Sequence, residues 1–372
     1  MEKSLTSSPG TNPQASLGVN AHSKIYIPSL DGMRILAFIV VFLSHTGLAN
    51  AFPGSFGVTV FFFLSGYLIT TLLRQECDRY ETIDFKLFYL RRILRIWPSF
   101  YLVLGLGAGL TILGLLPGKI LLPAFLAQSL HYTNYYGIFF GDGFVAGSWV
   151  YWSLAVEEHF YLLFPLLYLA LRKLRVSSRR QMLIFWGLCL TVLLWRCILV
   201  YGFQVPELRI FCSTDTRIDS ILFGCALAVN NNPMLDTQQD YSNKLWKYFF
   251  LPAGIILILF SCLSRSPEFR QTIRYTIQGI ALYPVFITAI RFPSWGLFAV
   301  LNLKWMRFLG ALSYSLYLVH YTVLFGVWKH FPQLNKVLQA GIALLISFGL
   351  AYMIHKFIEL PLGRLRKKFS RA

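Results

Sequence analysis

Charged residues are scarce in this sequence. They make up 13% of its 372 residues, about half the fraction usual in a soluble domain, while 56% of the residues are hydrophobic. Long polar stretches that could form a separate soluble domain are missing as well, so an ordinary cytosolic enzyme is excluded. Most of the apolar blocks reach the roughly 20 residues that a helix needs to cross a bilayer. We therefore expect an all-α polytopic membrane protein.

Acidic residues are the rarer sign of charge, with 16 Asp and Glu against 34 Lys and Arg and a net charge of +18. A nucleic-acid-binding chain would carry such an excess on a polar domain, but here the basic residues stand between apolar blocks. Positive charge between spans is typical of cytoplasmic loops. No nucleic-acid partner is expected.

Cysteine is also sparse, with six residues and no C-x-x-C pair. Because most of the cysteines fall inside apolar runs, we expect neither a metal site nor a disulfide framework. Residues 1–27 are rich in Ser, Pro, Asn and Gly and have no apolar core of a signal peptide. They are predicted to form a disordered cytoplasmic tail with no cleavable leader.

The apolar blocks predict about ten transmembrane helices with both termini in the cytoplasm. The segment 119–136 is apolar but contains Pro123 and polar residues, so it is interpreted as a re-entrant or surface segment. Residues 28–362 then form one transmembrane domain, followed by a basic cytoplasmic tail at 363–372. The predicted spans are 33–50, 57–75, 97–116, 148–171, 182–203, 216–230, 245–264, 272–290, 308–328 and 337–358.

The distribution of charge agrees with ten spans. The strongest basic clusters, in residues 74–96, 172–181 and 364–372, all fall on the cytoplasmic side, whereas the predicted outer loops 51–56 and 204–214 are nearly neutral.

Arg34 and His45 stand in the first span, where ionisable side chains cost a few kcal/mol and are functional candidates. Their spacing of eleven residues is close to three helical turns, so both project from one stripe, roughly 16 Å apart along the axis. Arg34 lies at the predicted cytoplasmic mouth and His45 beyond mid-membrane. A structural histidine bonded to a neighbouring helix is the alternative for His45.

The fourth span carries two adjacent carboxylates, Glu157 and Glu158, near mid-depth. Neighbouring residues of a helix point about 100° apart, so we expect one of the two to line a cavity. An ion pair that only fixes helix contacts remains possible as an alternative.

Other polar residues of the spans are open to two interpretations. Ser65 and Gly66 interrupt a run of phenylalanines, which a polar site and a close helix contact explain equally well. Tyr317 and His320 give the ninth span a polar stripe that could serve a site or form interhelical hydrogen bonds.

Charged groups also stand at both ends of the predicted path. Asp215, Arg217 and Asp219 open the sixth span, where they could hold a polar acceptor or pair with one another. Arg92 and Arg95 share a helix face and could grip phosphate groups, although basic residues beside a span often only set its topology.

Together these groups describe a polar path across the bilayer, which fits two classes of protein. A transporter would move a saccharide or lipid-linked sugar along it. An enzyme would bring together reactants from opposite faces, with imidazole as general base, a carboxylate that orients the hydroxyl and arginines that hold an anionic donor.

Seven segments of the sequence resemble, in the same order, the motifs of a known family. They are 30–34 with His45, 63–69, 92–95, 152–162, 214–219, 313–320 and 359–361. They resemble the L-D-G-x-R and R-x10-H, F-x-S-G-[FY]-L-I, R-x-x-R, W-S-L-x-x-E-E-x-F-Y-L and E-x-P motifs, with two further elements, of the acyltransferase-3 family of membrane O-acyltransferases. The likeness covers residues 29–362. One departure is His159, where the family usually has Gln.

The resemblance implies an acyl-CoA co-substrate, most often acetyl-CoA, and no permanently bound cofactor. The CoA phosphates would meet Arg34, Arg92 and Arg95 from the cytoplasm, and His45 would act as base or as transient acyl carrier. Catalysis is assigned to His45, Glu157 and Glu158. The acceptor-side or supporting residues are Asp31, Ser65, Asp215, Arg217, Asp219, Tyr317 and His320.

The expected acceptor is a hydroxyl of a glycan or lipid-linked sugar at the extracytoplasmic side, and the expected home is a bacterial cytoplasmic membrane. Many relatives append an extracytoplasmic SGNH-type hydrolase domain, and this sequence ends without one. We therefore expect the chain to act alone, to borrow an extracytoplasmic transferase, or to be a subunit that only hands the acyl group on.

Overall fold

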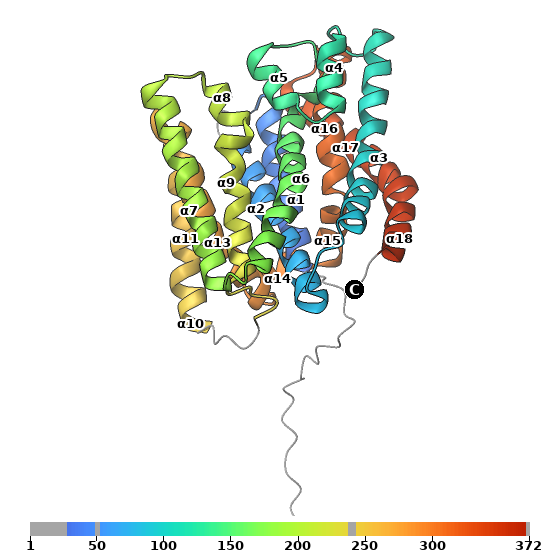
Figure 1. Ribbon diagram of the computed structural model, residues 1–372. Helices are drawn as coiled ribbons and strands as arrows, with labels where there is room; N and C mark the ends of the chain where they lie inside the picture. Colours follow the sequence, from blue (N-terminus) through green and yellow to red (C-terminus); the bar gives the residue numbers. More distant parts are fainter. Residues whose placement is uncertain (1–27, 49–52, 237–242, 370–372) are drawn as a thin grey trace, which may run out of the picture.

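The computed structural model describes residues 28–48, 53–236 and 243–369, and every regular element within them is a helix (Figure 1). The predicted tail 1–27 and residues 370–372 of the second predicted tail lie outside the described residues. The elements are α1 (Pro28–His45), α2 (Gly54–Tyr80), α3 (Phe85–Ile112), α4 (Leu122–Ser129), α5 (Thr133–Phe139), η1 (Ser148–Tyr151), α6 (Trp152–Lys173), α7 (Ser178–Cys197), η2 (Ile198–Gly202), α8 (Glu207–Cys212), α9 (Thr214–Val229), α10 (Asn243–Leu245), η3 (Trp246–Phe250), α11 (Leu251–Leu263), α12 (Pro267–Gln271), α13 (Arg274–Arg291), α14 (Leu297–Leu301), α15 (Lys304–Ala311), α16 (Ser313–His330), α17 (Lys336–Ile354), η4 (His355–Glu359) and α18 (Leu360–Lys368).

Six helical stretches of the described chain are long and apolar enough to cross a membrane. A seventh appears if α15 and α16, which meet at a bend of 62°, are counted as one span. The six are Gly54–Tyr80, Phe85–Ile112, Ser148–Lys173, Ser178–Gly202, Asn243–Leu263 and Lys336–Lys368. The prediction of an all-helical chain with several potential spans is confirmed, whereas the number ten and the orientation of the termini stay predictions.

The segment predicted to be re-entrant or superficial contains two short helices, α4 of 8 residues and α5 of 7 residues. Neither is long enough to cross a bilayer, which would take about 20 residues. Both lie at the end of the bundle where α8 also lies (Figure 1). Gln128 of α4 donates a hydrogen bond to the Ser148 hydroxyl and so ties this segment to the start of the η1–α6 stretch.

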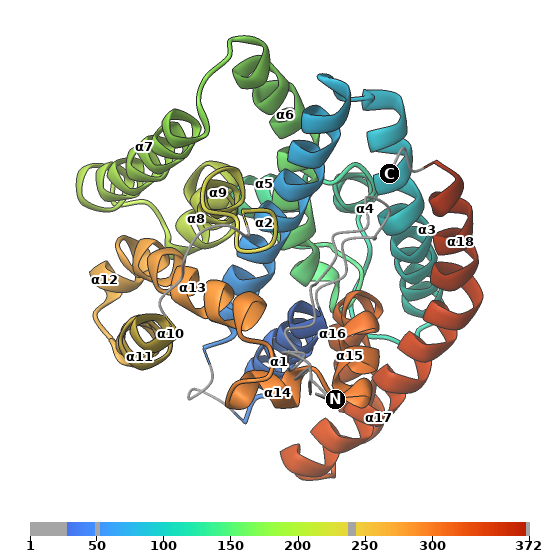
Figure 2. The same ribbon diagram turned by 90° about the horizontal axis from the view of Figure 1, so that it is seen from below.

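Helix α2 occupies the middle of the bundle, where it packs against α1, α6, α9 and α13 (Figure 2). Its contact with α9 is close because both helices present glycine there. A Cβ atom added to Gly66 would lie 2.0 Å from the carbonyl oxygen of Ile221, and one added to Gly224 would lie 2.0 Å from that of Phe63. The Ser65–Gly66 pair therefore does allow a close helix approach, one of its two predicted roles.

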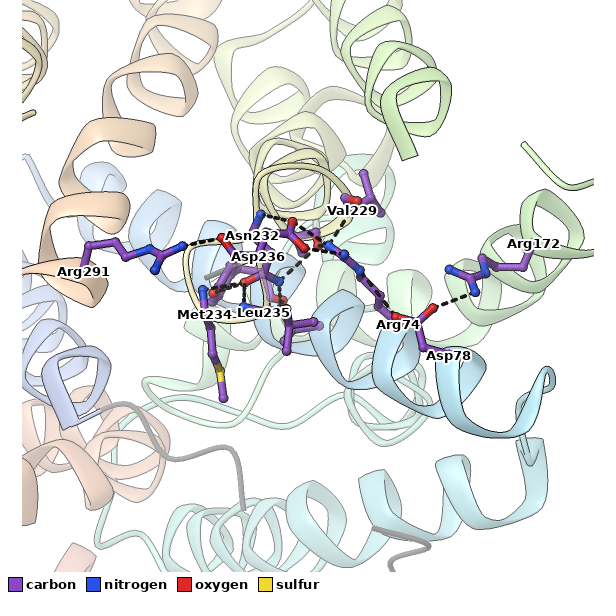
Figure 3. Close-up of polar contacts among 12 residues, drawn as sticks. Arg74, Asp78, Arg172, Val229, Asn232, Met234, Leu235, Asp236 and Arg291 are labelled. Carbon is purple, nitrogen blue, oxygen red and sulfur yellow. Dashed lines mark hydrogen bonds and ion pairs between the residues drawn. The ribbon is translucent and has the colours of Figure 1, made fainter. Parts of the chain in front are cut away.

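Ion pairs join helix ends at the face that carries α10 and α14 (Figure 3). Arg74 of α2 reaches both carboxylate oxygens of Asp236, at 2.6 and 3.0 Å, in the segment that follows α9. Arg172 of α6 lies 2.7 Å from Asp78 of α2. Basic residues of the predicted cytoplasmic clusters thus also connect α2 to α6 and to the end of α9.

Candidate functional site

A cavity of about 280 Å³ lies among α1, α2, α3, α6, α15 and α16. Much of its wall is apolar, but polar and charged side chains from five helices reach one shared space. Eight residues predicted from the sequence line it: Asp31, Arg34, Ser65, Arg92, Arg95, Glu157, Glu158 and Tyr317.

The start of α1 reaches this cavity because small residues let it approach its neighbours. A Cβ atom added to Gly310 of α15 would lie 2.0 Å from the carbonyl oxygen of Asp31. A Cβ atom added to Gly32 would lie 2.4 Å from the carbonyl oxygen of Leu301 in α14. Glycine at both positions therefore places Asp31 and Arg34 at the edge of the cavity.

Helix α3 supplies the other two arginines. It begins after Asp84, whose carboxylate accepts a hydrogen bond of 3.0 Å from the backbone N–H of Leu87 and caps the helix. Arg92 and Arg95 follow at a spacing of three residues, so they share the face that lines the cavity. The local sequence thus fixes where α3 starts and which side of it is cationic.

The arginines are only partly neutralised. Arg34 forms an ion pair of 3.1 Å with Asp31, but neither Arg92 nor Arg95 has a salt-bridge partner within the described residues. The Nε of Arg92 is buried and makes no hydrogen bond there. A buried guanidinium donor without an acceptor is costly unless a ligand supplies one, so this end of the cavity favours an anion.

Both carboxylates of α6 line the cavity, whereas the sequence predicts that one of them does. Glu157 interacts with Ser65 and lies within electrostatic reach of Arg34 and Arg95. Glu158 points elsewhere, toward Trp97 and Arg92, and its Oε1 is buried without a hydrogen-bond partner among the described residues. The two groups diverge as helix geometry requires, and the cavity borders the two neighbouring faces of α6 that carry them.

Tyr161, which was not among the predicted site residues, completes this part of the wall. Its hydroxyl lies 2.6 Å from the hydroxyl of Ser65, and the guanidinium of Arg92 lies 5.8 Å from its ring centre. It follows Glu157 by four residues, a spacing that places two side chains on the same helix face. That spacing is the sequence signal that could have identified it.

His45 and His320 do not line the cavity but contact each other beside it. Nδ1 of His45 lies 3.0 Å from Nε2 of His320. The ring of His320 lies 5.6 Å from the ring of Tyr317, which does line the cavity and whose hydroxyl lies 2.6 Å from that of Ser153. Tyr317 therefore stands between the cavity and the histidine pair.

The charged trio at the start of α9 lies outside the cavity and has partners of its own. Asp215 accepts hydrogen bonds from Arg209 and from Trp195, at 2.5 and 2.7 Å. Arg217 is fully buried, with its guanidinium 3.9 Å from the centre of the Tyr275 ring. The carboxylate of Asp219 lies 2.7 Å from Arg196, and both side chains are completely buried. Each member of the trio thus contacts a side chain outside the trio, and these distances show no pairing of the three with one another.

The structure also places His159, the departure from the family motif, and Arg366 of the predicted basic tail. His159 lies outside the cavity, with its Nδ1 2.7 Å from the hydroxyl of Thr214. Arg366 of α18, in the predicted basic tail, lies within electrostatic reach of Arg95 and Arg92. No local signal identifies Arg366, because it lies 271 positions after Arg95 in the sequence.

Comparison with known proteins decides which family this arrangement belongs to. The model of the acyltransferase-3 family, described as an acyltransferase domain, matches residues 27–356. The chain belongs to the acyltransferase-3 family. The match covers every helix that lines the cavity. No solved structure matches this acyltransferase-3 chain.

Curated relatives of this acyltransferase-3 chain are longer. It is 29% identical over 363 residues to the peptidoglycan O-acetyltransferase OatA of Listeria monocytogenes, a match that covers 92% of this chain and 57% of that protein. It is 30% identical over 365 residues to the O-acetyltransferase OatA of Staphylococcus aureus, which covers 94% and 59%. The chain thus spans less than two thirds of the length of these relatives.

Proposed function

We propose that this acyltransferase-3 chain is a membrane O-acyltransferase that moves an acetyl group from acetyl-CoA to a hydroxyl of a glycan. The observation that carries the proposal is a cavity lined both by two carboxylates and by two arginines that have no ion-pair partner within the described residues. Family membership and the relatives' printed activity as O-acetyltransferases support it. An anionic donor and a group that handles protons are what this reaction requires.

The donor is held by its phosphates at the arginine end. Arg92 and Arg95 have no salt-bridge partner within the part of the chain that the structure describes, and guanidinium groups bind phosphate oxygens bidentately. The cavity of about 280 Å³ is smaller than the whole coenzyme, so it takes the acyl end while the nucleotide stays at the mouth. Arg34, which Asp31 orients at 3.1 Å, contacts the donor beside them.

The chemistry is a direct exchange of a thioester for an ester. The acceptor oxygen forms a bond to the carbonyl carbon, the C–S bond breaks with its electron pair on sulfur, and the hydroxyl proton goes to His45. Glu157 and Glu158 orient the reacting groups and relay that proton from His45 to the departing sulfur. If His45 is instead a transient acyl carrier, its unprotonated ring nitrogen bonds to the carbonyl carbon as the C–S bond breaks. The acceptor oxygen then displaces that nitrogen, and the hydroxyl proton goes to the thiolate.

Transfer requires the acetyl group in the cavity to reach the acceptor beside His45, and Tyr317 separates the cavity from His45. The Tyr317 hydroxyl is held to Ser153 at 2.6 Å and to the carbonyl oxygen of Val150 at 3.0 Å. In the proposed reaction these two contacts open so that the acetyl group reaches the acceptor next to His45.

For the membrane, we propose ten spans in a bacterial cytoplasmic membrane, with both termini and the arginine end in the cytoplasm. The three spans beyond the seven long or bent ones are α1, α9 and α13, of 18, 16 and 18 residues. Each of the three carries an arginine. Arg217 and Arg274 are buried, and Arg34 faces the cavity. The acceptor is a saccharide hydroxyl at the outer face, of the class that the relatives' peptidoglycan activity represents, with an extracytoplasmic transferase as a possible partner.

The test is acetyl transfer in proteoliposomes that contain the purified chain. Labelled acetyl-CoA is supplied with peptidoglycan fragments, and the wild type is compared with His45→Ala for released CoA and for labelled glycan. We expect both products from the wild type and neither from the variant. Equal CoA release from both proteins would contradict the role of His45. Glycan movement across the bilayer without any acyl donor would favour a transporter, and CoA release without labelled glycan would favour a subunit that hands the acyl group to another enzyme.

A further inference from the structure

The contact between His45 of α1 and His320 of α16 is a hydrogen bond between two imidazole rings, and it determines where the protons lie. Nδ1 of His45 and Nε2 of His320 are 3.0 Å apart, so one nitrogen donates a proton and the other accepts it. Two bare nitrogens at this distance would repel. The other ring nitrogen of His320 decides which of them is the donor.

Nδ1 of His320 lies 2.8 Å from the backbone carbonyl oxygen of Tyr317. A carbonyl oxygen can only accept, so Nδ1 of His320 carries the proton of this hydrogen bond. His320 is fully buried, with the rings of Phe38 and Phe42 beside it and no carboxylate within salt-bridge distance among the described residues. A neutral imidazole in these surroundings has one proton, and its Nε2 is therefore the acceptor.

The consequence falls on His45. Its Nδ1 must donate to His320, so the neutral ring keeps a lone pair on Nε2, the nitrogen at the far side of the ring. Within the described residues that Nε2 has no hydrogen-bond partner, and His45 is only half-buried. A ring held in this way presents one unprotonated nitrogen that is free for chemistry.

We propose that His320 is a positioning residue that fixes the tautomer and the orientation of His45, so that Nε2 takes the proton of the acceptor hydroxyl. This inference rests on the proposed function. The hydroxyl O–H bond breaks, its proton goes to Nε2, the oxygen bonds to the acyl carbon, and the departing thiolate takes up the proton in turn. The bond from Nδ1–H of His45 to His320 persists throughout.

The same requirement holds if His45 is an acyl carrier, because the nitrogen that attacks must also be unprotonated. A third group that holds the base in one tautomer is the logic of a catalytic triad, with a neutral imidazole here in place of a carboxylate. General-base catalysis contributes about 10² to 10⁴ in rate, which bounds the effect of losing the correct tautomer.

The test uses two amide variants that differ in reach. The side-chain oxygen of His320→Gln comes to the place of Nε2 and can accept from His45, whereas that of His320→Asn is shorter and cannot. We expect kcat for acetyl transfer to fall about 100-fold or more in His320→Asn and less than about tenfold in His320→Gln. The KM for acetyl-CoA should stay unchanged in both.

Tyr321→Phe is the matched control. The Tyr321 ring stacks on His45 with centres 4.5 Å apart, and the variant keeps that stacking, so we expect wild-type kcat. In protein with ¹⁵N-labelled histidine, the signals of His45 should report a proton on Nδ1 in the wild type and in His320→Gln. In His320→Asn they should report a mixture of the two tautomers.

Equal kcat for His320→Asn and wild type, or one tautomer of His45 in all variants, would overturn the inference and leave the proposed function intact. So would a His320→Gln protein that is folded, binds acetyl-CoA and is as slow as His320→Asn. Failure of the function itself looks different, because His45→Ala would then transfer acetyl groups at the wild-type rate.

Discussion

At the scale of single residues, Arg92 has an incomplete set of contacts. Its guanidinium lines the cavity, its Nε is buried without an acceptor and no carboxylate within the described residues pairs with it. Arg91, the residue before it, is paired with Glu76 at 3.1 Å and serves the structure. Two adjacent arginines thus have different roles, which the sequence R-R does not reveal.

We predict that Arg92→Gln raises the KM for acetyl-CoA about tenfold or more with little change in kcat, because a hydrogen bond to a charged group is worth about 1.5–3 kcal/mol. Steady-state kinetics in proteoliposomes measures both constants. Arg79→Gln is the control, since Arg79 is exposed at the end of α2 and lies outside the cavity. A KM that rises equally in both variants would mean that only the general positive charge of this face matters.

At the scale of helices, the site depends on how closely α2 can approach its neighbours. Ser65 lines the cavity and hydrogen-bonds Tyr161, while the next residue, Gly66, contacts the backbone of α9. Gly66 thus makes the close helix contact, and Ser65 lies where the interpretation as part of a polar site requires it. Adjacent positions on α2 serve the site and the packing because they face different directions.

Gly66→Ala should destabilise the protein by more than 1 kcal/mol, because its Cβ would lie 2.0 Å from the carbonyl oxygen of Ile221 and overpacking typically costs about 1–3 kcal/mol. The midpoint of thermal unfolding in detergent should fall. Gly109→Ala is the matched control, since nothing lies within 4 Å of the added Cβ on the same kind of helix. An unchanged midpoint in Gly66→Ala would show that α2 and α9 can separate without loss.

At the scale of the whole molecule, the charge pattern and the path of the chain favour the proposed orientation, with one end of the bundle in the cytoplasm. The basic segment 172–181 follows α6, whose other end is preceded by the segment that joins α5 to η1. These two connections therefore lie at opposite ends of one long helical stretch, Ser148–Lys173. The positive-inside rule predicts that the basic one lies in the cytoplasm.

We predict that a single cysteine at Asp142, between α5 and η1, reacts in intact cells with a thiol reagent that cannot cross the membrane. A cysteine at Arg175, between α6 and α7, should react only after the membrane is opened. The background is a variant without the six native cysteines, four of which are buried in any case. Labelling of Arg175→Cys in intact cells would reverse the proposed orientation.

Much of the candidate site could be predicted from residue identity and spacing. The sequence predicts the arginines at 92 and 95 and the carboxylates at 157 and 158 because each pair is a local feature of one helix. The structure brings both pairs to one cavity. The stripe shared by Arg34 and His45 was a weaker guide. One face of a helix contacts different neighbouring helices along its length. Here Arg34 lines the cavity, whereas His45 contacts His320.

The sequence by itself determined the helical, membrane-type character of this chain and the chemical groups that its helices carry, because hydrophobic length and residue spacing are local properties. Only the tertiary structure decided that Tyr317 separates the cavity from the histidine pair and that His45 donates to a ring 275 residues away. Such partners depend on which helices pack side by side. Close contacts determine that packing, such as those of Gly66 in α2 with α9 and of Gly310 in α15 with α1, and the helices that they join are distant in the sequence.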